Sequence, residues 1–182
     1  MKRRSLIIGA SGLFLAALVG IVCFNFFKTS EEITESVIVK DLGKLAQIFA
    51  KIHAGCQIIG FDHQKTLINF LNVKGFSGSE VGSMNLAHPE KWEGPYLDEN
   101  PTVQDQEYQV IKTNQGYFIT PGEGVMLPNN KVIGKDIILD EHANITAMMQ
   151  DENSLAYQGQ SFAVRMVDLE LHINPVVVEM SE

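Results

Sequence analysis

The sequence lacks most of the features by which small exported enzymes and disulfide-rich domains are recognised. Its two cysteines are Cys23, inside a long apolar run, and Cys56, far beyond it. The two cannot pair within one chain if that run lies in a membrane, which excludes a disulfide scaffold. There is no nucleophile elbow, no phosphate-binding loop and no closely spaced pair of His or Cys residues. We therefore predict a protein that is not an enzyme.

Metal-binding patterns are equally sparse. The five histidines are scattered along the chain: His53, His63, His88, His142 and His172. Two acidic turns, at residues 140–144 and 151–153, carry oxygen ligands of the kind that calcium prefers. The interpretation as solvated surface turns is favoured over calcium binding. We predict no cofactor, with calcium at these two turns as the alternative.

One long apolar run is present, and the rest of the chain is organised around it. Residues 6–27 contain no charged side chain, and the run reaches the roughly 20 residues that a helix needs to cross a bilayer. Lys2, Arg3 and Arg4 precede it, while the first acidic residue, Glu31, follows it. This asymmetry predicts a single-pass protein of a bacterial inner membrane with a cytoplasmic N-terminus. The predicted division is an anchor at 1–28 and an exported, periplasmic α+β domain at 29–182.

Two other interpretations of the apolar run remain open at this point. A cleaved signal peptide has a shorter apolar region and ends in small residues, whereas this run ends in Phe26 and Phe27. A lipoprotein signal ending at Cys23 would need a small residue where Val22 stands. A retained membrane anchor is the favoured prediction.

The net charge of the predicted exported part limits the classes of molecule that it can bind. The chain has 14 basic and 22 acidic residues, and four of the basic residues precede Thr29. The exported part therefore has 10 basic and 22 acidic residues, a net charge of −12. Such a surface disfavours nucleic acid and anionic lipid head groups, so we predict no nucleic-acid partner.

The spacing of apolar residues predicts helices in the first part of the exported domain and strands in the later part. An apolar stripe with spacings of three and four runs from Ile33 to Ile52 and predicts an amphipathic helix that ends near Gly55. Residues 63–73 are interpreted as a second helix, followed by a Gly- and Ser-rich loop. From Glu107 onward the pattern predicts antiparallel strands. Two hairpins are expected, with turns around residues 114–116 and 128–130. Further strands are expected at 136–140, 145–149 and 161–173.

The stretch from Trp92 to Leu97 reads WEGPYL and contains the only tryptophan of the chain. It resembles a W-x-GPYL-like stretch of the type IV pilin-like proteins, most closely the major pseudopilin of type II secretion systems. The resemblance implies a long N-terminal helix, half in the membrane and half packed on a small antiparallel sheet. The acidic residue that this family carries shortly after its processing site has no counterpart here, because no Asp or Glu precedes Glu31.

The resemblance implies a structural subunit of a type II secretion or type IV pilus-like assembly that serves protein transport. Its partners would be further copies, other pilin-like subunits and the secretion or pilus machinery. The alternative is a membrane-tethered periplasmic binding or scaffold domain. Small residues in the membrane run permit close approach of helices. The candidate interaction residues are Gly9, Gly12, Ala16, Gly20, Trp92, Gly94, Pro95 and Tyr96.

Overall fold

The computed structural model describes residues 19, 33–75, 80–81 and 83–166. Among these residues the protein is α+β, with one long helix at 33–56 and small antiparallel sheets. The other elements are β1 (Ile58–Phe61), β2 (Lys65–Leu67), β3 (Glu80–Val81), β4 (Met84–Leu86), η1 (Pro89–Lys91), β5 (Thr102–Val103), β6 (Gln106–Glu107), β7 (Gln109–Thr113), β8 (Gly116–Thr120), α2 (Ile145–Met148), β9 (Ala156–Tyr157), β10 (Gln160–Ser161) and β11 (Val164–Arg165).

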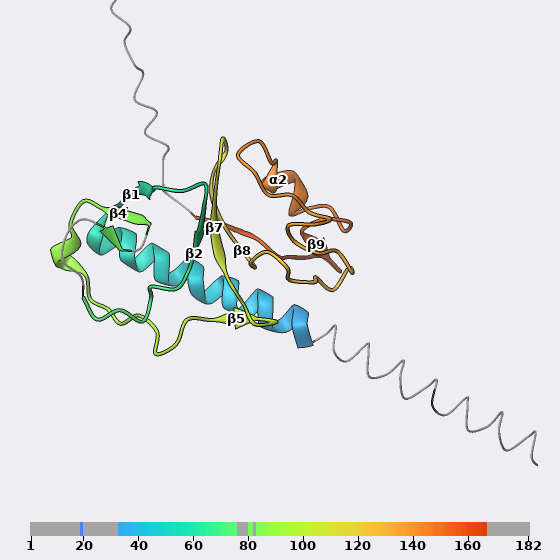
Figure 1. The fold of residues 1–182 in the computed structure, drawn as a ribbon, viewed down its shortest axis with the longest axis horizontal. Coiled ribbons are helices and arrows are strands. Elements are labelled where there is room, and N and C mark those ends of the chain that lie inside the picture. The colour runs from blue at the N-terminus through green and yellow to red at the C-terminus, as the bar shows by residue number, and fades with distance from the viewer. Residues whose placement is uncertain (1–18, 20–32, 76–79, 82, 167–182) are drawn as a thin grey trace, which may run out of the picture.

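The apolar stripe of the long helix is confirmed. One face is buried, at spacings of four and three, through Ile38, Leu42, Leu45, Phe49, Ile52 and Cys56. Two members of the predicted stripe, Ile33 and Val37, are instead 59% and 38% exposed, because the described part of the domain does not cover the start of the helix (Figure 1). The predicted end at Gly55 was wrong by one residue. The helix includes Cys56, and Gln57 adopts a φ of 54° just after it.

A four-stranded antiparallel sheet, with strand order β11-β8-β7-β2, lies against this helix. The Phe49 ring on the helix packs 6.3 Å from Phe61, which packs 5.3 Å from Tyr117 of β8. On the other side of the sheet lie residues 121–163, which include α2 and β9 (Figure 1). All five residues of β8 are buried, and since consecutive strand residues face opposite ways, both faces of the sheet are covered.

The hairpin predicted around residues 114–116 is confirmed as β7 and β8, paired from Gln109–Thr120 to Thr113–Gly116. Gly116 closes the turn with a φ of 119°, which favours glycine. The second predicted hairpin is present as one antiparallel bridge between Met126 and Val132, with Asn130 in the turn at a φ of 62°.

Several other predicted elements were wrong. Residues 63–73 contain β2 and irregular backbone in place of a helix. Thr66, Ile68 and Phe70 are buried while Leu67 and Asn69 are exposed, which is the two-residue period of an extended chain. The Gly- and Ser-rich loop after it contains β3, paired with β4. Residues 76–79 and 82 lie outside the described part.

The predicted strand at 145–149 is the helix α2, because the Asn144 side chain accepts a hydrogen bond from the Ala147 amide and caps it. The predicted strand at 136–140 has only a single parallel bridge, between Ile133 and Ile137. The strand predicted at 161–173 is described to residue 166, where it is split between β10 and β11.

A polar contact also joins the long helix to Tyr108, the residue just before β7. The Tyr108 hydroxyl, on a fully buried side chain, donates to Asp41 Oδ2 at 3.1 Å. Burial raises the pKa of Tyr108 above its ordinary value of 10.0, and the negative charge of Asp41 raises it further.

A pH dependence follows from this contact. A raised pKa in the folded state means that the neutral phenol stabilises the fold below pH 10, and that this stability is lost as the pH rises above it. The loss is about 1.4 kcal/mol per pH unit for one such group. Urea unfolding between about pH 9.5 and 11 should therefore show a smaller loss for Tyr108→Phe than for the unaltered chain. An equal loss in both proteins would contradict this assignment.

Candidate functional site

The half of the candidate site that the sequence predicts to lie in a membrane is outside the described residues. Gly9, Gly12, Ala16 and Gly20 all lie outside the described residues, as does the apolar run apart from Val19. Within the described residues, no helix is both long enough and apolar enough to span a bilayer. The four remaining candidates, Trp92, Gly94, Pro95 and Tyr96, are described and come together in one loop.

This loop, which we call the aromatic loop (residues 92–97), is held against the chain by hydrogen bonds to two backbone carbonyls. The Trp92 indole Nε1–H donates to Val73 O at 2.9 Å. The amides of Tyr96 and Leu97 both donate to Leu71 O, at 2.8 and 3.2 Å. The loop is therefore fixed to the segment that follows β2.

Inside the loop the two aromatic rings pack on each other. The Trp92 and Tyr96 rings meet edge to face, with centroids 4.7 Å apart and planes at 84°, a geometry that aromatic quadrupoles favour. The Gly94–Pro95 peptide bond between them is cis. A Cβ on Gly94 would lie 2.2 Å from both Trp92 Nε1 and Val73 O. Only glycine fits at this position without displacing the hydrogen bond.

The aromatic loop also touches the C-terminal end of the long helix. Lys51 Nζ lies 5.5 Å from the centre of the Tyr96 ring and 3.4 Å from Glu93 Oε2. Just before the loop, the His88 amide donates to the carbonyl of Cys56, the last helical residue, at 2.9 Å. The aromatic loop is thus a rigid corner that ties the helix end to the rest of the domain.

Cys56 is fully buried beneath this corner. Burial raises the pKa of its thiol, while a hydrogen bond with Tyr96 acts in the opposite direction. Burial likewise raises the pKa of the Tyr96 hydroxyl. Both groups therefore stay protonated at neutral pH, which suits packing and disfavours a thiolate nucleophile.

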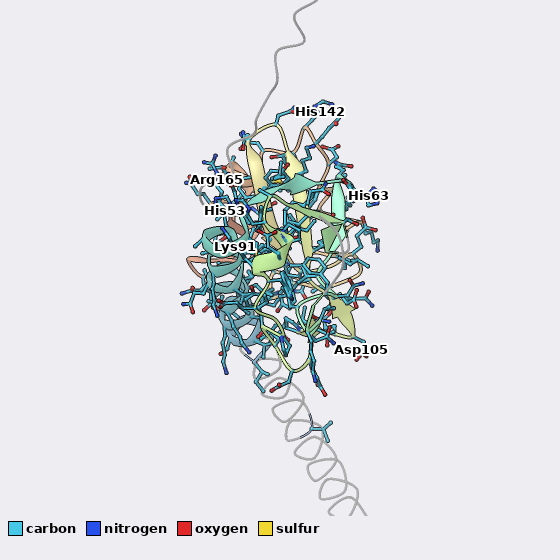
Figure 2. The ribbon with its side chains drawn as sticks, turned by 90° about the vertical axis from the view of Figure 1, so that its left-hand side faces the viewer. His53, His63, Lys91, Asp105, His142 and Arg165 are labelled. Carbon is cyan, nitrogen blue, oxygen red and sulfur yellow. The ribbon has the colours of Figure 1, made fainter. Side chains whose placement is uncertain are left out.

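The described histidines do not converge on one site. The labelled side chains of His53, His63 and His142 lie at separate places on the domain (Figure 2). Within the part of the chain that the structure describes, no group of three His, Cys, Asp or Glu side chains is arranged to hold a metal ion.

The two acidic turns considered for calcium have carboxylates that accept backbone hydrogen bonds. Asp140 Oδ1 accepts from the His142 amide and Asp151 Oδ1 from the Asn153 amide, each at 2.9 Å. The two oxygens of Glu152 accept from the amides of residues 158 and 159. These side chains therefore stabilise turns.

Sequence reasoning identified the aromatic loop but missed its anchors. The carbonyls of Leu71 and Val73 hold the loop, and a backbone carbonyl has no signature in the sequence. Comparison with family models, with curated proteins and with solved structures found no match for this chain.

Proposed function

We propose that this chain is a membrane-anchored, pilin-like structural subunit of a type II secretion or type IV pilus-like assembly. The observation that carries the proposal is the position of the long helix. Its described part starts six residues after the apolar run of residues 6–27, and it forms one wall of the domain core through six buried positions. In this proposal, a helix placed in this way would connect a membrane anchor to the exported fold.

The aromatic loop supports the same proposal. It matches the W-x-GPYL-like stretch of the pilin-like family in residues 92–97. It contacts the end of the long helix through Lys51, which lies over the Tyr96 ring and pairs with Glu93. A subunit that bears mechanical load benefits when the anchor helix cannot be pulled out of its domain separately.

In this proposal the function is mechanical. The apolar run would hold each subunit in the inner membrane, and Gly9, Gly12, Ala16 and Gly20 would allow the anchors of neighbouring copies to pack closely. The partners would be other copies, related subunits and the assembly machinery. The exported domain would lie in the periplasm, with residues 29–182 carrying the subunit surface.

The test is self-association of the full chain in bacterial membranes, measured by chemical cross-linking and gel analysis. The double variant Gly12→Leu with Ala16→Leu fills two small positions on one side of the run. We expect the cross-linked fraction to fall roughly fivefold, as for loss of about 1 kcal/mol of helix packing. The matched control, Phe14→Leu with Leu18→Ile, changes large residues on the other side and should leave it unchanged. Equal association in both variants would contradict assembly through this stripe.

The second candidate function is a tethered periplasmic binding or scaffold domain that does not assemble. It is favoured by a groove of about 540 Å³ at the sheet edge beside β2. A chain of this kind would remain monomeric in the cross-linking experiment and would still bind a partner through its domain.

A further inference from the structure

Strand β2 leaves one edge of the four-stranded sheet open within the described residues, since it is the last strand in the order β11-β8-β7-β2. The Ile68 amide donates to Tyr108 O and the Lys112 amide to Gln64 O, both at 2.8 Å. In this segment the even-numbered residues therefore point their backbone N–H and C=O groups toward β7. In an antiparallel pair the intervening residues point their backbone N–H and C=O groups away from the partner strand. Here these residues are Lys65 and Leu67.

The two residues with outward backbone groups, Lys65 and Leu67, also line a groove of about 540 Å³. Its lining comes from β2 and β7, from the β5–β6 hairpin and from the turn after β8, through Leu67, Gln109, Thr102, Gln106 and Gly122 together with the charged residues described next. The Leu67 side chain is 51% exposed and gives the groove an apolar wall. Gly122 allows the turn to approach closely, because a Cβ there would lie 2.2 Å from Glu107 O.

The negative charge of the groove favours an occupant with positive charge. Asp105, Glu107 and Glu123 line it, and its one basic residue, Lys65, is already paired with Glu123. Asp105 lies at the opposite end of the domain from His142 (Figure 2), so this acidic site is separate from the acidic turn at residue 140. An extended segment with basic side chains would complement the groove.

Two occupants from the chain itself are disfavoured by charge. Residues 167–182 contain four acidic residues and no Lys or Arg. A second copy carries a net charge of −8. Both would bring further negative charge to three carboxylates, which costs free energy at short range.

We propose that the groove binds an extended, basic segment of a different protein by adding it as a strand to the edge of β2. The segment's backbone would bond to the outward N–H and C=O groups of Lys65 and Leu67. Its Lys or Arg side chains share one face of the strand and would lie over the groove, with their charged ends toward Asp105 and Glu107 and their aliphatic stems on Leu67. In strand addition the main chain supplies affinity and the alternating side chains supply specificity. This inference is independent of filament assembly.

The test uses the full chain in detergent and dye-labelled six-residue peptides, with binding followed by fluorescence anisotropy. The first probe alternates lysine and valine, the second alternates glutamate and valine, and the third is the lysine peptide with alternate backbone nitrogens methylated. We expect only the first to bind. N-methylation keeps the charge but removes the donors that a paired strand needs. Equal binding of the first and third probes, binding of the glutamate probe, or no binding at all would overturn the proposal.

Variants of the chain locate the site. Leu67→Pro removes an outward N–H, a change that edge strands tolerate, and should weaken binding of the lysine peptide by about tenfold or more. Asp105→Asn with Glu107→Gln should weaken it similarly without changing the backbone. The matched control, Asp140→Asn with Glu141→Gln, removes two exposed carboxylates elsewhere and should have no effect. Equal weakening by the control pair would show nonspecific attraction and contradict the assignment to β2.

Discussion

Replacing Gly94 with alanine is expected to destabilise the domain by about 3 kcal/mol, as urea unfolding followed by circular dichroism would show. The added methyl group would lie 2.2 Å from both Trp92 Nε1 and Val73 O. Val73 O is a backbone atom, so the clash cannot be relieved by turning a side chain. The hydrogen bond between these two groups would break, and the edge-to-face contact of Trp92 with Tyr96 would shift with it.

Gly55→Ala is the matched control for this prediction. Gly55 lies within the long helix, and a Cβ there meets nothing within 4 Å. Alanine is the better helix former, so this variant should be stabilised by about 0.5 kcal/mol. Should both variants unfold at the same urea concentration, the aromatic loop would not have the rigid role that we assign to it.

Truncating Leu45 to alanine is expected to have an effect of similar or greater size. Leu45 is fully buried on the sheet-facing side of the long helix, and deleting its side chain should cost about 2–5 kcal/mol through lost burial and the cavity left behind. Its neighbour Lys44 is exposed, and Lys44→Ala should stay within about 0.5 kcal/mol of the unaltered chain. The measurement is again the free energy of unfolding in urea.

The contrast between these neighbours tests whether the helix is part of the core. A helix that only tethers the domain would tolerate both changes, and the two variants would then unfold together. A large effect at Leu45 alone means that the segment following the apolar run cannot detach without unfolding the domain. The proposed transmission of force from a membrane anchor to the domain would depend on this property.

The sequence predicted best where local signals agree with the tertiary structure. The hairpin of β7 and β8 could be predicted because its turn residues, 114–116, stand between two alternating segments. The buried stripe of the long helix could be predicted because several turns of regular spacing leave little ambiguity.

Prediction failed where tertiary contacts decide between helix and strand. Residues 63–73 have apolar side chains that fit a helical face, yet Leu67 is exposed at the sheet edge and Thr66 is buried. The short apolar stretch after Asn144 is compatible with either a strand or a helix. It forms a helix because the Asn144 side chain caps its N-terminus. The groove beside β2 could not be predicted, because its lining residues come from four separate segments of the chain.

We propose that copies of this chain assemble through a membrane anchor that is continuous with the domain. Cross-linking of the unaltered full chain in bacterial inner membranes tests it most directly, with the mass of the products read on a denaturing gel. We expect a membrane-bound protein that gives a ladder of dimers and larger species, and we expect that ladder to be lost when Gly12 and Ala16 are replaced by leucine. A protein that stays monomeric at every cross-linker concentration, or that is found outside the membrane fraction, would contradict it.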